Sequence, residues 1–312
     1  MKKIFFIIPT LTQGGAERVI VTLLKFLDRT KFKATIIVVN MNEEVYSEEI
    51  PEEVDIIDLQ CKRVRTAIPK IIFNLWRHKP DIVMSTLGHL NIAIAMTRIF
   101  MPFGIKFIAR ETIVVSEKLS RGKFQKLWKL LHRIFYPTFD KIICQSEDML
   151  RDISDILGSK KKLVLINNPV DLLRIQNLAR LCDQSVEKYY NDKNYIYLVA
   201  AGRLIEQKGF EMLIEAIASI DNPNIRLAIL GHGPLEEKLI SLIEHYKLHD
   251  QVTLLGYQKN PYMWVSRADA FVLSSYYEGF PNVVLEALSC STPVISTPAP
   301  GGTKEILESI DG

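Results

Sequence analysis

Residues 195–230, YIYLVAAGRLIEQKGFEMLIEAIASIDNPNIRLAIL, decide the fold class. The stretch opens with an apolar, strand-like segment and passes through a short loop into residues 210–220, where apolar residues recur at helical spacing. It closes with a second strand-like segment, and both such segments are almost continuously apolar, as in parallel strands buried on both faces. The stretch therefore predicts a strand–helix–strand unit within a parallel α/β sheet.

The same alternation of strand-like and helical segments extends in both directions along the chain. Further strands are expected at KKIFFIIP (2–9), FKATIIVVN (32–40), VDIIDL (54–59), DIVMSTL (81–87), IKFIAR (105–110), KIICQS (141–146), VTLLG (252–256), DAFVLSS (269–275) and PVIST (293–297). A polar stretch interrupts the pattern, and 312 residues are more than one ordinary core requires. We predict two Rossmann-like, doubly wound domains, residues 1–168 and 195–312, joined by a linker at 169–194. Because such sheets bind ligands at the carboxyl ends of their strands, we expect the active site in a central cleft between the two domains.

Composition excludes several classes of protein. The four cysteines lack metal-ligand or C-x-x-C spacing, which favours a reducing cytosol over a disulfide framework. The longest apolar stretch contains Arg98, Pro102 and Lys106, so no transmembrane segment is expected. An N-terminal apolar run ends at Pro9 without a cleavage site, and a first buried strand explains it better than a signal peptide does.

Charge is distributed unevenly along the chain. Residues 1–180 hold 29 Lys and Arg against 19 Asp and Glu, a balance of +10, whereas the remainder holds 10 against 17. The first half is therefore expected to face something anionic, for which nucleic acid, anionic lipid and a phosphorylated substrate all remain open.

The loop that follows the strand at 195–201 carries Arg203 and Lys208. A guanidinium and an ammonium beside a helix N-terminus can together hold a diphosphate. The alternative is that both side chains are solvated loop charges, as exposed cations usually are.

Glycines mark two further loops after strands. LGHGP (230–234) lacks the third glycine of the dinucleotide fingerprint, so a nicotinamide cofactor is disfavoured. Gly14 and Gly15 would let a phosphate or a sugar approach a helix N-terminus, although a tight turn explains them equally well.

SSYYEGFPNVVLEA (274–287) brings two carboxylates, Glu278 and Glu286, to a loop and the helix that follows it. Pro281 suits a first helical turn, and the free N–H groups of a helix start can meet an anion or hydroxyl groups. Carboxylates accept hydrogen bonds from sugar hydroxyls. No D-x-D sequence or cluster of metal ligands accompanies them, so we predict neither a metal nor another cofactor. Arg203 and Lys208 would then stabilise a leaving diphosphate electrostatically.

Residues 117–137 predict an amphipathic helix in which an apolar stripe alternates with cations. The cations that would face a membrane are Lys126, Lys129 and Arg133. Two interpretations stay open: the helix lies on an anionic membrane, or its stripe is simply part of the core.

GGAERV, AGRL…QKG, LGHGP and the segment from VTLLGYQKNPYMW to GGTKEIL, taken together, resemble the retaining glycosyltransferase family 4, which has the GT-B fold. The resemblance implies that Arg203 and Lys208 hold the diphosphate of a nucleotide sugar, that Glu286 holds the ribose and that Glu278 holds the donor sugar. It further implies that the donor is lined by Gly279, Phe280, Pro281, Asn282, Val283, Tyr257 and Lys259, with Gly14 and Gly15 on the opposite domain.

Two departures from the family pattern matter. Many relatives have a histidine after the strand that matches KFIAR, whereas this chain reads Arg110, Glu111 and Thr112, with His89 as the nearest alternative. We expect His89, Arg110 and Glu111 to contact the acceptor or a membrane. Relatives also continue beyond KEILESIDG, so a truncated C-terminal domain is expected.

The function expected from the resemblance is transfer of a hexose or N-acetylhexosamine, with retention, from a UDP-sugar to a polyprenyl-diphosphate-linked saccharide. Such an enzyme would assemble surface polysaccharide or glycan, be cytoplasmic and attach peripherally to the inner face of an anionic membrane, without a nucleic-acid partner. The alternatives are a nucleotide-sugar epimerase of the same architecture and a non-catalytic nucleotide-sugar-binding or scaffold protein.

Overall fold

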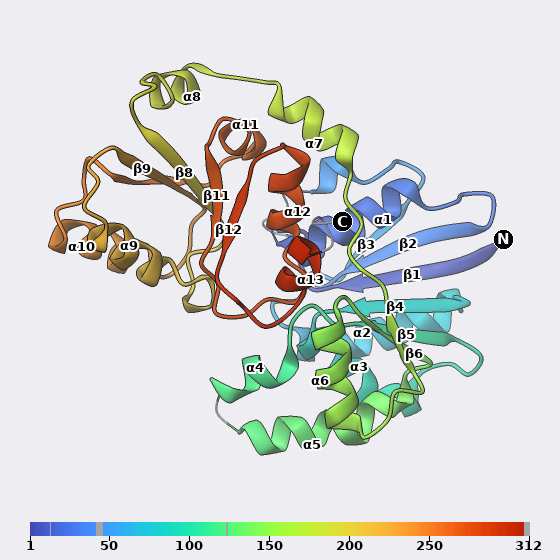
Figure 1. Cartoon of the computed structure of the whole chain (residues 1–312). Helices are drawn as coiled ribbons and strands as arrows, with labels where there is room; N and C mark the ends of the chain where they lie inside the picture. Colours follow the sequence, from blue (N-terminus) through green and yellow to red (C-terminus); the bar gives the residue numbers. More distant parts are fainter. Residues whose placement is uncertain (13, 42–45, 123, 309–312) are drawn as a thin grey trace. The chain divides into compact units, whose positions relative to one another are not determined.

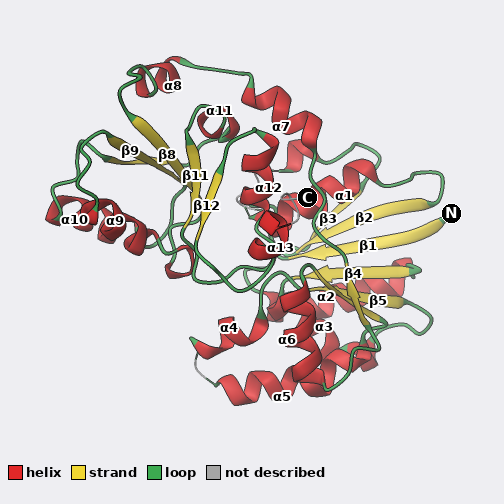
Figure 2. Cartoon of the chain, viewed as in Figure 1, coloured by secondary structure: helices red, strands yellow, loops and turns green. Residues whose placement is uncertain are grey.

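A computed structural model describes residues 1–12, 14–41, 46–122 and 124–308. The chain forms two compact units, Met1–Pro169 and Val170–Gly312, and each is described by itself (Figure 1). Strands and helices alternate along both units (Figure 2).

The first unit is built on a seven-stranded parallel sheet in the order β3-β2-β1-β4-β5-β6-β7. Its strands are β1 Lys2–Ile8, β2 Phe32–Val38, β3 Asp55–Asp58, β4 Ile82–Thr86, β5 Lys106–Arg110, β6 Lys141–Cys144 and β7 Leu163–Leu165. Ile4 of β1 lies opposite Ala34 of β2 on one side and Ile82 of β4 on the other. The first strand of the chain is therefore a central strand, which explains its almost continuous apolar sequence.

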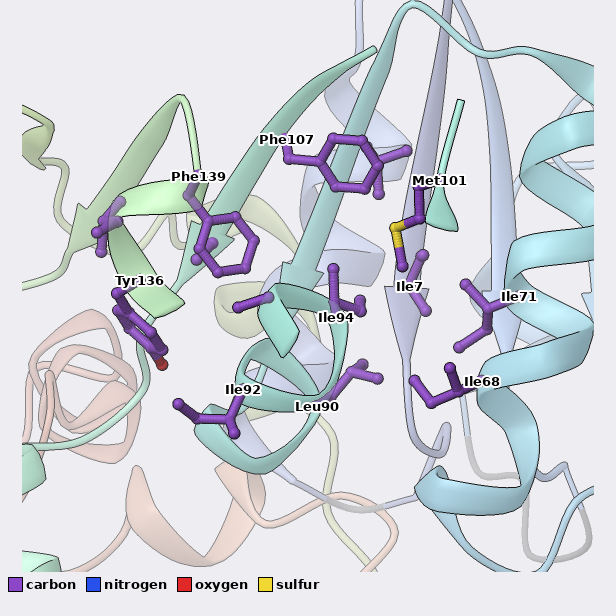
Figure 3. Packing of buried hydrophobic residues seen from close by; sticks show 14 of the residues in the cluster. Ile7, Ile68, Ile71, Leu90, Ile92, Ile94, Met101, Phe107, Tyr136 and Phe139 are labelled. Carbon is purple, nitrogen blue, oxygen red and sulfur yellow. The ribbon is translucent and has the colours of Figure 1, made fainter. Parts of the chain in front are cut away.

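Helices cover both faces of this sheet. They are α1 Gly15–Phe26, α2 Val64–His78, α3 Gly88–Met96, α4 Val115–Ser120, α5 Gln125–Phe135 and α6 Glu147–Leu157, with short 3-10 turns η1 Ser47–Glu49, η2 Arg98–Phe100 and η3 Tyr136–Thr138. Residues of α1 share a core cluster with Tyr46 and Ile50, whereas residues of α2, α3 and α6 share a separate cluster. In that second cluster Ile71 of α2 and Leu90 of α3 pack towards Ile7 of β1 (Figure 3).

The second unit has a five-stranded parallel sheet in the order β10-β9-β8-β11-β12. Its strands are β8 Ile196–Ala201, β9 Ile225–Leu230, β10 Val252–Gly256, β11 Ala270–Leu273 and β12 Val294–Ser296. Its helices are α7 Leu172–Ala179, α8 Gln184–Tyr189, η4 Glu206–Lys208, α9 Phe210–Ser219, α10 Glu236–His245, α11 Tyr262–Val265, α12 Asn282–Ser289 and α13 Thr303–Glu308. The strand–helix–strand unit expected at 195–230 is β8, α9 and β9.

The segment 169–194, which was expected to be a linker, is instead structured as part of the second unit. It contains α7 and α8, each capped by an aspartate side chain at its N-terminus. Val186 of α8 is fully buried in the same core cluster as Trp264, and Asn260 donates a hydrogen bond to the carbonyl oxygen of Leu178. The polar composition of this stretch reflects the exposed sides of two short helices rather than an extended connection.

The helix expected at 117–137 is also different in the structure. It is divided into α4 and α5, with Gly122 between them and Phe124 in the left-handed region at φ 64°. Residue 123 lies outside the described part of the chain. None of the helices that the structure describes has the length and apolar character needed to span a bilayer.

Candidate functional site

Two loops at the carboxyl edge of the second sheet bring Lys208 and Glu278 together. The Lys208 ammonium donates a hydrogen bond to Oε1 of Glu278 at 2.6 Å, and the Ser275 hydroxyl donates to the same oxygen at 2.6 Å. Only 6% of Glu278 is exposed. Two of the three residues predicted to be catalytic therefore form an ion pair in which the carboxylate is buried and the Lys208 side chain is 17% exposed, and Ser275 is a partner that the sequence did not reveal.

Backbone contacts explain how these two loops reach each other. Gly209 follows Lys208 in the left-handed conformation, φ 63°, and a Cβ placed there would come within 2.1 Å of the carbonyl oxygen of Ser274. The Ser274 hydroxyl donates to the carbonyl oxygen of Lys208 at 2.8 Å, and Gln207 donates to that of Tyr277 at 2.9 Å. Only glycine permits this approach, because any other side chain would collide with the backbone of the neighbouring loop.

The loop after β12 holds the other side of the Glu278 backbone. The Glu278 N–H donates to the carbonyl oxygen of Pro300 at 2.9 Å, and the Gly302 N–H donates to that of Gly279 at 2.7 Å. Gly301 has φ 122°, and a Cβ there would lie 2.4 Å from the carbonyl oxygen of Glu278. The paired glycines of PAPGGT, residues 298–303, were the available signal for this contact.

The remaining donor-side residues lie on the same unit, in varied settings. Arg203 is exposed on the loop that leads from β8 to Lys208, and Glu286 is half-buried on α12. Pro281 is the N-cap residue of α12 rather than part of its first turn, and Asn282 begins the helix. The backbone predicted to line the donor, including Gly279, Phe280 and Val283, thus leads from Glu278 directly into that helix start.

The loop after β10 carries the residues expected near a nucleotide base. Tyr257 and Lys259 are both exposed. The Tyr257 ring meets the His232 ring edge to face, with centroids 6.2 Å apart. His232, expected to be a turn residue, therefore joins an aromatic surface at the ends of β9 and β10.

A second buried carboxylate, Glu111, lies just after β5 at the carboxyl edge of the first sheet. It is 0% exposed, and its Oε1 accepts hydrogen bonds from Asn91 Nδ2 at 2.9 Å and from the Tyr136 hydroxyl. Its Oε2 has no hydrogen-bond partner among the described residues and faces Gly88, where a Cβ would be 3.4 Å away. Burial, followed by the charge of Glu111, raises the pKa of Tyr136 well above its usual value, so the phenol stays protonated as a donor.

Arg110, expected to contact the acceptor or a membrane, is instead buried beside Glu111. Its guanidinium donates to Thr86 Oγ1 at 3.2 Å and to Asn168 Oδ1 at 2.7 Å. Burial lowers the pKa of Arg110 to about 10, while the charges of Glu17 and Glu111 oppose that shift. Arg110 therefore remains charged at neutral pH and is a structural anchor.

Three other predicted residues of the first unit lie near this edge of the sheet. His89, in the first turn of α3, is exposed, and desolvation followed by the Lys118 charge lowers its pKa. Gly14 is the N-cap residue of α1 and Gly15 begins that helix. A Cβ on Gly14 would lie 1.9 Å from a carboxylate oxygen of Glu17, a buried acid that the sequence analysis did not select.

The apolar residues of α5 are divided between a buried side and an exposed side. Leu131 and Phe135 pack against the core of the first unit, and His132 is buried. A second row of apolar side chains is exposed, and it consists of Phe124, Leu127, Trp128, Leu130 and Ile134. Lys126 and Arg133 are exposed among them, whereas Lys129 is half-buried. The helix therefore both packs on the core and presents an apolar, basic surface.

The second unit offers the elements needed to hold an anionic, hydroxyl-rich ligand. An ammonium has three donors, so Lys208 can keep its bond to Glu278 and still donate to a phosphate oxygen. Glu278 in turn retains acceptor capacity for sugar hydroxyls. Across the described ranges, no group of three or more His, Cys, Asp or Glu side chains is placed to hold a metal ion.

Two family models match the chain. The model for Glycosyltransferase Family 4 matches residues 13–174, and the model for glycosyl transferases group 1 matches residues 183–311. The two matches follow the two structural units.

Two curated relatives have more than 30% identity to this chain. An uncharacterized glycosyltransferase of Methanocaldococcus jannaschii is 35% identical over 76% of this chain and 60% of its own length. A Campylobacter jejuni enzyme, the N-acetylgalactosamine-N,N'-diacetylbacillosaminyl-diphospho-undecaprenol 4-alpha-N-acetylgalactosaminyltransferase, is 31% identical over 98% of this chain and 83% of its own length.

Among solved structures, the HepE protein of Anabaena in complex with UDP-glucose is similar in fold. Its TM-score is 0.78 at 18% identity, and the match covers 98% of this chain and 83% of that protein. The two Rossmann-like units are those of the GT-B fold. With the family model covering more than half of its residues, the chain belongs to glycosyltransferase family 4.

Proposed function

We propose that this protein transfers a hexose or N-acetylhexosamine from a UDP-sugar to a polyprenyl-diphosphate-linked saccharide, with retention and without a metal ion. The transfer would extend a lipid-linked glycan that is later used in surface polysaccharide or glycoconjugate assembly. Family membership and the acceptor in the name of the Campylobacter relative support this choice of reaction and acceptor. UDP-glucose bound to the HepE protein supports the choice of donor.

The observation that carries the proposal is the pairing of Lys208 with the buried carboxylate of Glu278 at the carboxyl edge of the second sheet. In the proposed reaction Lys208, assisted by Arg203, stabilises the negative charge that develops on the departing UDP diphosphate. Glu278 accepts hydrogen bonds from the donor sugar and lies beside the positive charge that develops at its anomeric carbon. Glu286, just over one turn into α12, would hold the ribose hydroxyls.

The exposed row of α5 supports the lipid part of the proposal. Apolar side chains interleaved with Lys126 and Arg133 suit a helix that lies in the interface of an anionic bilayer. A lipid-linked acceptor is held in such a bilayer, so this helix would keep the enzyme where its acceptor is.

The test is a transfer assay with purified protein, a synthetic undecaprenyl-diphosphate disaccharide and UDP-glucose, UDP-GlcNAc or UDP-GalNAc, with and without EDTA. One donor should give an extended product whose new linkage has the anomeric configuration of the donor, and EDTA should not reduce the rate. Binding of a UDP-sugar without any transfer would favour a binding protein. Conversion of the donor in the absence of acceptor would favour an epimerase.

A further inference from the structure

A surface outside the proposed site exposes an unusual concentration of large apolar side chains. The loop that leads from α3 to β5 presents Ile99, Phe100 and Phe103 with exposures of 79%, 60% and 93%. Phe73 and Trp76, on the last two turns of α2, are exposed as well. We refer to these five side chains as the 99–103 surface. Neither α5 nor the donor loops contribute to it.

The loop is anchored, so its apolar side chains are held outward by the fold. Met101 is 1% exposed and Ile105 is also buried, and both belong to the core cluster of the first unit. Figure 3 shows Met101 beside Ile7, directed into that cluster. The indole N–H of Trp76 donates to the carbonyl oxygen of Phe100 at 2.9 Å, which joins the end of α2 to the loop.

The charge of the surrounding chain indicates what covers this surface. Lys106, which begins β5 shortly after the loop, is exposed and pairs with Asp140. Arg77 and Lys79 follow Trp76 directly and are exposed. A basic, aromatic surface repels a second copy of itself in a symmetric dimer, in which identical patches face each other. It is complementary to an anionic lipid headgroup layer, where aromatic side chains and cations both concentrate.

The position of the surface in the fold agrees with this partner. The 99–103 surface belongs to the end of α2 and to the loop that follows α3, and α3 packs against both α2 and α5. All three helices contribute to or pack against the same core cluster, on one face of the first sheet. The exposed row of α5 and the 99–103 surface therefore belong to elements that pack on the same face of the first sheet.

We propose that the 99–103 surface is a second membrane-docking element, which inserts Ile99, Phe100 and Phe103 into the interface of an anionic bilayer. The proposal goes beyond the transfer reaction, because it assigns a lipid surface to a region of the first unit, whereas the donor loops belong to the second unit. It does not depend on the identity of donor or acceptor.

Vesicle flotation tests the proposal with the full chain. Vesicles of phosphatidylglycerol and phosphatidylethanolamine are compared with phosphatidylcholine vesicles, at about 50 mM and about 500 mM salt. The double variant Ile99→Ser/Phe103→Ser should lower the partition coefficient on anionic vesicles about tenfold or more, because it removes two inserted apolar side chains. The matched control is Phe26→Ser, an exposed residue at the end of α1, and it should bind as the wild type does.

Tryptophan fluorescence gives a second readout. The chain has three tryptophans, and Trp264 is only 2% exposed. In a Trp128→Phe variant, Trp76 is therefore the tryptophan that can report on lipid contact, and its emission should shift to the blue when anionic vesicles are added.

Outcomes that overturn the proposal are distinct from those that overturn the transfer reaction. Unchanged flotation of the double variant, or unchanged Trp76 emission, would show that the 99–103 surface does not bind lipid. A wild-type dimer that the double variant converts to a monomer in light scattering would assign the surface to a second copy. UDP-sugar binding, measured on the same samples, reports on the donor site alone and confirms that the variant is folded.

Discussion

Each unit buries a glutamate at the carboxyl edge of its sheet, and the two carboxylates are held in opposite ways. Glu111 in the first unit is bound by the neutral donors Asn91 and Tyr136. Glu278 in the second unit is bound by the cation Lys208 as well as by the Ser275 hydroxyl. A carboxylate bound by fixed neutral donors is part of the packing of its unit. A carboxylate that is paired with an ammonium leaves that ammonium with further N–H donors, and these can bind an arriving anion.

Removing the charge of Glu278 is the strongest test of the difference between the two carboxylates. Glu278→Gln should lower the transfer rate by about 10²- to 10³-fold, because a neutral amide cannot stabilise the charge that develops on the donor sugar. Steady-state transfer to the lipid-linked acceptor measures the effect. Glu215→Gln, an exposed residue of α9, is the matched control and should keep the wild-type rate. A Glu278→Gln rate within threefold of wild type would contradict the assignment.

Removing the Lys208 ammonium tests whether Lys208 and Glu278 stabilise each other. Lys208→Met leaves a buried carboxylate without its ammonium, and the free energy of unfolding should fall by about 3 kcal/mol. Denaturant unfolding of the single variants and of Lys208→Met/Glu278→Gln forms a double-mutant cycle. The double variant should recover most of the lost stability but none of the transfer. Additive losses would show that the two side chains do not interact.

The first carboxylate should matter mainly for stability. Glu111→Ala leaves the Tyr136 hydroxyl and the Asn91 amide without their shared acceptor, which costs about 2 kcal/mol of unfolding free energy. Calorimetric binding of the UDP-sugar, a property of the second unit, should be unchanged. If donor binding falls while stability is preserved, the contrast between the two carboxylates is wrong.

A smaller change removes the hydrogen bond from Tyr136 and keeps the Glu111 carboxylate. Tyr136→Phe keeps the ring that packs on His132 and Phe139 but removes one donor to Glu111. The free energy of unfolding should fall by about 1 kcal/mol in denaturant titrations. His132→Phe alters the same aromatic group without touching Glu111 and serves as the comparison; an equal loss in both would assign the effect to packing.

The smallest expected effect is a pH dependence at His89. Its pKa is lowered from 6.5, so below that pH the unfolded chain binds a proton more readily than the folded chain does. The contribution to stability is therefore complete above pH 6.5 and is lost as the pH falls through the lowered pKa. Thermal unfolding of the wild type should lose more stability than His89→Gln between neutral and mildly acidic pH. If the stabilities of the wild type and of His89→Gln change in parallel with pH, His89 does not contribute to stability in this direction.

The sequence predicted the sheets better than the connections between them. Every long apolar run expected to be a strand is one, because burial on both faces leaves a continuous signal. The three residues of β7 are too short for such a signal. The helices α7 and α8 are short, and in each a single residue, Ile175 or Val186, is buried, so neither gives a long amphipathic pattern.

The candidate site was predicted residue by residue but not as an arrangement. Lys208 and Glu278 were both selected, yet their contact joins positions 70 residues apart and depends on loop conformation. Ser275 carries no local signal of its role, which follows from its hydroxyl lying beside the Glu278 carboxylate. The burial of Arg110 was likewise invisible, because a charged residue at a strand end is usually exposed.

The strand order of the first sheet also has a consequence for how the chain is synthesised. β1 is translated first, but its second neighbour, β4, begins only at Ile82. The centre of that sheet therefore cannot close until β4 has left the ribosome, and contacts so distant in sequence form slowly. The whole first sheet is nonetheless complete by Leu165, before the second unit has been made. The first unit can thus finish folding during translation, and a ribosome stalled beyond it should carry a protease-resistant nascent domain.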